Sequence, residues 1–117
     1  MSFTVIAPIF NEEKNVQILF DEILNSCSKI PLTQVIFVND SSSDESLNQL
    51  KNIKNSKFKF ISHDSTLGQS AAIHSGVINS QTDVIITIDG DLQNDPSDIP
   101  KIFNKFLELK KNKIFIQ

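Results

Sequence analysis

Residues 84–96 read VIITIDGDLQNDP, where an apolar, β-branched run passes directly into a polar turn. This pattern predicts a buried strand that ends at Asp89. The carboxylates of Asp89 and Asp91, on either side of Gly90, can turn oxygens toward one hard cation, and Mg²⁺ and Mn²⁺ both accept oxygen ligands. A solvated loop whose acids only cap the following helix explains the bare triplet equally well.

The charge around residues 89–91 favours a bound cation over a loop that is only solvated. Residues 83–98 contain five Asp and no Lys. Negative charge at this density is costly unless a cation binds or solvent screens it. A divalent ion shared between these acids and a pyrophosphate would relieve the repulsion on both sides, so we expect a Mg²⁺ or Mn²⁺ site here.

Outward from this stretch, strand-like and helix-like patterns alternate along the whole chain. Helical or small-residue segments separate the predicted strands, which lie at residues 3–9, 35–38, 57–62, 84–88 and 114–116. This order predicts one α/β domain with a doubly wound, mainly parallel sheet and flanking helices. Ligands of such sheets bind outside the carboxyl ends of the strands, where this chain places its polar clusters.

The ends and faces of the helices are also predicted. Glu12 and Glu13 are expected in the first turn of the first helix, where the helix dipole favours acids. Ser42 and Glu45 have capping-box spacing, which predicts that the second helix begins there. Cys27 continues the apolar stripe of the first helix and is expected in the core. One apolar face is expected on the last helix, formed by Ile99, Ile102, Phe103, Phe106 and Leu107.

The composition excludes several kinds of site. The 117 residues carry a formal charge of −3, and all 11 cationic side chains are Lys, so no guanidinium can clamp a phosphate. A pI near 5.2 argues against nucleic acid as a partner. The single Cys27 excludes a disulfide framework and a cysteine-built zinc site. The absence of a long apolar stretch and of a signal pattern favours a cytoplasmic protein.

Asp40 follows the second strand, where it can accept a hydrogen bond from a base N–H or a ribose hydroxyl; an Asx-turn is the alternative. Gly68 opens a small-residue segment, but the sequence around it is neither a dinucleotide-binding fingerprint nor a P-loop. His63 and His74 lack the spacing of a metal-binding pair, so a structural or surface role is expected for each.

Four segments, taken in order, resemble the motifs of the family 2 glycosyltransferases with the GT-A fold: IAPIFNEEKN, FVNDSSSDES, LGQSAAIHSG and IDGDLQNDPSDIP. The form DGDLQ, followed by Pro96 and Pro100, is most similar to the branch that transfers a sugar to a polyprenyl phosphate, such as dolichol-phosphate mannose synthases and bactoprenol glucosyltransferases. Asn39 departs from the pattern, because the family usually has the first of two Asp there.

The resemblance implies a UDP- or GDP-sugar donor and a Mg²⁺ or Mn²⁺ cofactor that stabilises the departing nucleoside diphosphate. It implies that Asp89 and Asp91 are the catalytic residues of a DxD-type site, with Gln93 as a further metal ligand. It implies that Asp40 contacts the base. The nucleotide-binding residues implied in this way are Pro8, Phe10, Glu12, Asp40, Gly68 and Asp89.

The resemblance covers the donor-binding half of such enzymes. Residues 1–117 are therefore expected to be the N-terminal, nucleotide-sugar-binding part of a transferase domain truncated at its C-terminus. The expected function is sugar transfer in cell-wall or glycolipid synthesis, with a membrane polyprenyl phosphate as one candidate acceptor and a peripheral location at the cytoplasmic membrane face. The alternative is a nucleotide-binding module without turnover of its own.

Two further expectations concern the C-terminal end. Acidic residues at strand ends are also typical of a receiver-like regulatory domain, but this class is disfavoured because its lysine after the last strand cannot be placed here. An edge strand at residues 114–116 would allow pairing into a homo-oligomer.

Overall fold

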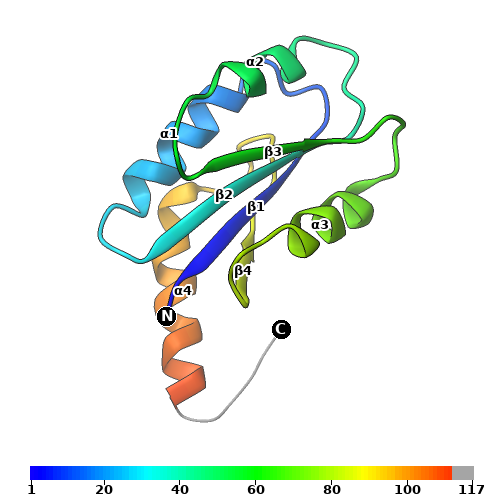
Figure 1. Ribbon diagram of the computed structural model, residues 1–117. Helices are drawn as coiled ribbons and strands as arrows, with labels where there is room; N and C mark the ends of the chain where they lie inside the picture. The colour runs from blue at the N-terminus through cyan, green and yellow to red at the C-terminus, as the bar shows by residue number, and fades with distance from the viewer. Residues whose placement is uncertain (112–117) are drawn as a thin grey trace.

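The computed structural model describes residues 1–111, which form a central parallel sheet with helices on both faces (Figure 1). The strands are β1 (Phe3–Ile9), β2 (Leu32–Asn39), β3 (Phe58–Ser62) and β4 (Val84–Thr87), in the order β3-β2-β1-β4. The helices are α1 (Val16–Ser26), α2 (Ser46–Asn52), α3 (Gln69–Ile78) and α4 (Ile99–Lys111), and a 3₁₀ turn, η1 (Pro96–Asp98), precedes α4. The expected parallel α/β fold is confirmed; the strand expected at residues 114–116 lies outside the described residues.

The two faces of the sheet belong to two cores, because successive residues of a strand point to opposite sides. On one face Phe3, Val5 and Ile9 of β1 join a core that also contains side chains of α1, α2 and α4. On the other face Ile6 packs with Ala72 of α3. Figure 1 shows α3 on the opposite side of the sheet from the other helices, which is the doubly wound arrangement.

The apolar stripe predicted for the first helix is confirmed. Its buried residues are Val16, Leu19, Phe20 and Ile23. Cys27, at the end of the helix, is only 3% exposed and belongs to the same core. The Phe20 ring also meets the rings of Phe37 and Phe58 edge-on, so α1 is held against β2 and β3 by aromatic packing.

Both predicted helix starts are wrong. Glu12 and Glu13 lie in a turn before α1, whose first turn contains no acid. The capping box of Ser42 and Glu45 does not form, since Glu45 itself is the N-cap of α2 and makes no side-chain cap. The reason is tertiary: the Ser42 hydroxyl accepts a hydrogen bond from the backbone N–H of Asn11 instead.

The apolar face predicted for the last helix is only partly buried. Ile99 and Phe103 are almost fully covered, and the Phe103 ring stacks on Phe3 with 4.6 Å between centroids. Ile102 and Leu107 are exposed. Figure 1 shows the second half of α4 running beyond the sheet, so little is available there for it to pack against.

The backbone of α3 lies close to the sheet. A Cβ added to Gly76 would come within 2.6 Å of the Ile6 side chain, so this position of α3 leaves no room for a side chain against β1. No helix within residues 1–111 is long and apolar enough to cross a membrane.

The strand order places a topological switch point beside β1. The chain goes from β1 to β2 and β3 on one side, and then returns to β4 on the other side of β1. α1, which follows β1, and α3, which leads into β4, therefore lie on opposite faces of the sheet, and a crevice opens outside the carboxyl ends of β1 and β4 (Figure 1). This crevice is where a ligand of such a sheet is expected.

Candidate nucleotide-sugar site

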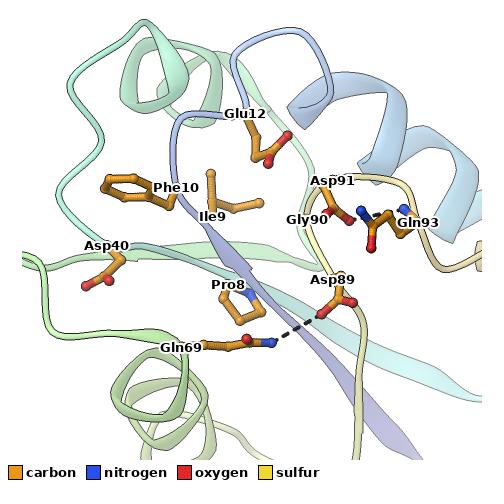
Figure 2. Close-up of a pocket in the computed structure, with 10 residues that line it drawn as sticks. All are labelled: Pro8, Ile9, Phe10, Glu12, Asp40, Gln69, Asp89, Gly90, Asp91 and Gln93. Carbon is orange, nitrogen blue, oxygen red and sulfur yellow. Dashed lines mark hydrogen bonds between the residues drawn. The ribbon is translucent and has the colours of Figure 1, made fainter.

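A pocket of about 360 Å³ lies at this switch point (Figure 2). Its lining residues come from the ends of β1, β2 and β4 and from the start of α3, and they are Pro8, Ile9, Phe10, Glu12, Asp40, Gln69, Asp89, Gly90, Asp91 and Gln93. In Figure 2 Phe10 and Asp40 lie on one side of the pocket, and Asp89, Asp91 and Gln93 lie on the other. The pocket thus has one side with an aromatic ring and one side rich in oxygen ligands.

The end of β1 supplies the apolar wall. Pro8 and Ile9 still pair with β2, and the chain then leaves the sheet at Phe10. The Phe10 side chain is 49% exposed although it is a large apolar ring. A flat aromatic face that stays open beside a polar pocket is suited to stacking against a planar base.

Hydrogen bonds tie the loop after β1 to the loop after β2. The backbone N–H of Asn11 donates to Ser42 Oγ at 3.0 Å, and the N–H of Ser43 donates back to Asn11 Oδ1 at 2.8 Å. The N–H of Glu12 donates to Ser46 Oγ at 2.8 Å. These bonds fix the backbone that carries Phe10 and Glu12, so the wall of the pocket is preformed.

The three non-glycine residues of the described chain with left-handed backbone all lie in loops around the pocket. Asn11, Ser41 and Leu92 have φ values of 53°, 59° and 64° and follow β1, β2 and β4, respectively. A branched apolar residue such as Leu92 adopts this conformation at some cost, which the surrounding structure must offset. Such strain is typical of loops whose shape is needed for binding.

Asp40 is buried at the end of β2 and is held by three donors. The backbone N–H groups of Leu67 and Gly68 donate to its carboxylate at 2.8 and 2.9 Å, and His63 Nδ1 lies 2.9 Å from Oδ1. Burial raises the pKa of Asp40, but these hydrogen bonds outweigh it and leave the pKa below its ordinary value of 3.8. Asp40 is therefore ionised at neutral pH and also anchors the loop before α3.

The loop after β4 carries Asp89, Asp91 and Gln93. Gln69 Nε2 donates to Asp89 Oδ1 at 3.2 Å, which links the start of α3 to this loop (Figure 2). The backbone N–H of Gln93 donates to Asp91 Oδ1 at 3.1 Å and turns the chain back toward the pocket. Among the side chains that the structure describes, those of residues 1–109, neither carboxylate forms an ion pair with a lysine.

The donors present suit a hard divalent cation. Four lining side chains are carboxylates and none is a lysine: Glu12, Asp40, Asp89 and Asp91. The Gln93 amide adds an uncharged oxygen, and oxygen ligands of this kind fit Mg²⁺ or Mn²⁺. Nowhere in residues 1–111 do three or more His, Cys, Asp or Glu side chains cluster closely enough to hold a metal by themselves. A bound cation would complete its coordination with ligand phosphate oxygens and water.

The structure brings together nearly all of the residues singled out from the sequence. The predicted residues that line the pocket are Pro8, Phe10, Glu12, Asp40, Asp89, Asp91 and Gln93. Gly68 is not a lining residue; it contributes its backbone N–H to Asp40 and precedes α3 with φ 98°. Ile9, Gln69 and Gly90 also line the pocket, although none of them is among the site residues predicted one by one. For Gln69 a signal existed, since it directly follows a glycine at the start of a helix on the sheet's carboxyl edge.

A parallel sheet of this order, with a pocket at its switch point, defines a Rossmann-like α/β domain of the type that binds nucleotides. The chain belongs to glycosyl transferase family 2, because the model of that family matches residues 4–115. The resemblance seen in the four sequence motifs is thereby confirmed.

Curated relatives of this chain include transferases that act on polyprenyl phosphates. It is 34% identical over 103 residues to the undecaprenyl-phosphate 4-deoxy-4-formamido-L-arabinose transferase of Proteus mirabilis, covering 85% of this chain and 32% of the relative. It is 32% identical over 109 residues to the dodecaprenyl-phosphate galacturonate synthase of Rhizobium johnstonii, covering 90% of this chain and 32% of that protein. The chain thus spans about a third of the length of these relatives.

Two solved structures that hold nucleotide sugars share the fold. The S. aureus TarS fragment 1–349 in complex with UDP-GlcNAc superposes with a TM-score of 0.69 at 23% identity, over 92% of this chain and 31% of that one. A mannosyltransferase from Pyrobaculum calidifontis, in complex with GDP-Man and Mn²⁺, superposes with a TM-score of 0.67 at 18% identity, over 76% of this chain and 27% of that one. The expected GT-A type of fold is confirmed.

Proposed function

We propose that this chain is the donor-binding part of a glycosyltransferase that moves a sugar from a nucleoside diphosphate sugar to a polyprenyl phosphate. The observation that carries the proposal is the acidic pocket at the switch point of a family 2 chain. The names of two curated relatives support the acceptor class. A polyprenyl phosphate acceptor would place the protein at a membrane surface, in keeping with the expected peripheral location.

The nucleoside would occupy the side of the pocket formed by β1 and β2. Phe10 offers an exposed ring for the base, while Pro8 and Glu12 line the pocket beside it. Asp40 is ionised, so it can only accept hydrogen bonds, and a base N–H is the partner proposed for it. Gly68 would act through its backbone, which holds Asp40.

The diphosphate would lie toward the loop after β4, with a Mg²⁺ or Mn²⁺ ion held by Asp89, Asp91 and the Gln93 amide oxygen. When bound, such an ion supplies positive charge that stabilises a leaving diphosphate. The chain itself offers no arginine for this purpose. The solved mannosyltransferase with GDP-Man and Mn²⁺ supports this choice of cofactor. Asp89 and Asp91 are thus the proposed catalytic residues, because they would hold this ion beside the departing diphosphate.

A second candidate is a nucleotide-binding module without turnover of its own. It is favoured by the site itself, since the residues proposed for it, such as Phe10, Asp40 and Asp91, all serve the donor. Both candidates require the same donor pocket, and they differ only in whether sugar is transferred.

Both candidates require that the pocket bind a nucleoside diphosphate. Calorimetric titration with UDP, GDP and CDP, each with and without Mn²⁺, tests this binding. At least one nucleoside diphosphate is expected to bind, and to bind about tenfold more tightly with the ion, since opposite charges meet in a partly enclosed pocket. Equal affinity with and without Mn²⁺ for all three would contradict the donor site.

The matched variants are Asp91→Asn and Asp98→Asn. Asp91→Asn removes a charge from the pocket and should abolish the gain in affinity that Mn²⁺ produces. Asp98 lies outside this pocket and pairs with Lys101 at an exposed position, so Asp98→Asn should keep that gain. Transfer of labelled sugar to a polyprenyl phosphate by this chain would support the enzyme; donor binding without transfer would support the binding module.

A further inference from the structure

Three side chains from different parts of the chain form a continuous relay behind the pocket. Asp40 Oδ1 lies 2.9 Å from His63 Nδ1, and His63 Nε2 lies 2.8 Å from Ser75 Oγ. The side chains of Asp40 and His63 are only 7% and 9% exposed. Asp40 lines the pocket, whereas His63 and Ser75 do not.

The chemistry of the three groups fixes the direction of the hydrogen bonds. An ionised Asp40 has no proton to donate, so His63 Nδ1 must carry the proton that the two share. In the neutral ring Nε2 is then an acceptor, and the Ser75 hydroxyl donates to it. The relay therefore selects the Nδ1–H tautomer of His63.

The relay connects to the pocket at Asp40, whose carboxylate also holds the loop before α3. Besides His63, the carboxylate accepts the backbone N–H groups of Leu67 and Gly68, and the next residue, Gln69, reaches Asp89 across the pocket. A carboxylate offers about four acceptor sites, and three are occupied here. His63 is the only side chain among the three donors, so it is the donor that a substitution can remove while the backbone N–H groups of Leu67 and Gly68 stay in the chain.

We infer that His63 is a positioning residue: it holds the Asp40 carboxylate, and with it the loop of Leu67 and Gly68, in the orientation that the nucleoside side of the pocket needs. The consequence for ligand binding rests on the proposed function. Ser75 is the outer end of the relay, and its hydroxyl meets the ring at Nε2, away from the bond between Nδ1 and Asp40. It is not a nucleophile for a ligand in this pocket, because it lies on α3 outside the lining residues.

Conservative variants of His63 distinguish its role as a hydrogen-bond donor to Asp40 from a role in which the ring only fills space. The side-chain nitrogen of Asn reaches the position of the His Nδ1 atom, so His63→Asn can still donate to Asp40. The longer Gln places its amide nearer to the position of Nε2, so His63→Gln fills the site without that donor. Ser75→Ala leaves the Nδ1 bond intact.

Calorimetric titration of these variants with the nucleoside diphosphate that the wild type binds best, in the presence of Mn²⁺, is the first test. His63→Gln is expected to weaken binding about tenfold, the size of one hydrogen bond to a charged group. His63→Asn and Ser75→Ala are expected to stay within about threefold of the wild type. Equal affinity of all three variants and the wild type would overturn the proposal.

Two nuclear magnetic resonance measurements test the relay without any nucleotide. A long-range ¹H–¹⁵N spectrum of the neutral His63 ring should show the Nδ1–H tautomer, and the Nε2–H tautomer would overturn the inference. Amide exchange of Leu67 and Gly68 should accelerate in His63→Gln and not in His63→Asn, and unchanged exchange in both variants would also overturn it. If the wild type binds no nucleoside diphosphate, the proposed function fails, while these spectra still decide whether His63 positions Asp40.

Discussion

At the scale of single residues, Gly90 shows how closely the loop after β4 approaches β1. A Cβ at this position would lie 2.5 Å from the backbone oxygen of Pro8 and 2.9 Å from Ile9 Cδ1. The first of these contacts is with backbone, which cannot swing aside as a side chain can. Only glycine therefore lets Asp89 and Asp91 flank the same pocket.

Gly90→Ala is expected to push this loop away from β1. Overpacking of this kind costs about 1–3 kcal/mol of stability, and we expect the Mn²⁺-dependent affinity for a nucleoside diphosphate to fall as well. Gly76→Ala is the matched control, because the three atoms nearest to its Cβ would all belong to the Ile6 side chain, on the far face of the sheet. Urea unfolding and calorimetry on both variants check this, and unchanged affinity in Gly90→Ala would contradict it.

The lowered pKa of Asp40 predicts a dependence of stability on pH. A carboxyl group whose pKa is lower in the folded than in the unfolded protein stabilises the fold. This stabilisation is complete at a pH above the unfolded pKa, and it is lost as the pH falls through the folded pKa. The free energy of unfolding of the wild type should therefore exceed that of Asp40→Asn by a constant amount above about pH 5, and the gap should narrow below 3.8.

The cost of Asp40→Asn at neutral pH should be about 1–3 kcal/mol, since an amide cannot satisfy every donor that faces the carboxylate. Urea unfolding of both proteins at a series of pH values measures the gap. A gap that stays constant from pH 6 to pH 3 would show that the carboxylate charge contributes nothing to stability.

At the scale of elements, α4 is held to the sheet by one end. Phe103 is 2% exposed and its ring stacks on Phe3 of β1, whereas Leu107, about one turn further along the helix, is 36% exposed. The apolar spacing of this helix predicts a broad buried face, but only the part that lies over the sheet is covered. The sequence period identifies which residues share a face, and the length of the neighbouring element decides how many of them are buried.

Phe103→Ala should lower the free energy of unfolding by about 3–5 kcal/mol, because it leaves a cavity and removes the stacked pair. Ile102→Ala is the matched control on the same helix and should change it by no more than about 0.5 kcal/mol. Chemical denaturation of the two variants measures the difference, and similar losses in both would mean that α4 packs through a different face.

At the scale of the whole molecule, the single thiol reports on global unfolding. Burial raises the pKa of Cys27 to about 11, although Lys57 lowers it slightly, so at neutral pH the group is almost entirely protonated as well as covered. Labelling with iodoacetamide at neutral pH should therefore be slow in the native protein and fast in denaturing urea. A nucleoside diphosphate with Mn²⁺ should slow it further, because a ligand of the native state reduces opening. Rapid labelling of the native protein would contradict the burial of Cys27.

The sequence by itself determined the class of fold and most of the candidate site. Alternating strand and helix patterns predict a parallel sheet, and a parallel sheet brings the carboxyl ends of its strands to one edge. The residues that follow β1, β2 and β4, such as Glu12, Asp40 and Asp91, could therefore be grouped without a structure. Their roles as nucleotide and metal ligands stay predictions.

Only the tertiary structure decided the contacts between loops. Ser42 caps no helix because its hydroxyl accepts a hydrogen bond from the backbone N–H of Asn11. Asp40 forms hydrogen bonds with His63 and Leu67, which lie more than 20 residues away in the chain. The sequence pattern of a segment predicts the helix, strand or turn that the segment can form with its own backbone. Hydrogen bonds between loops depend instead on which strands are neighbours, and that is fixed only when the sheet has been assembled.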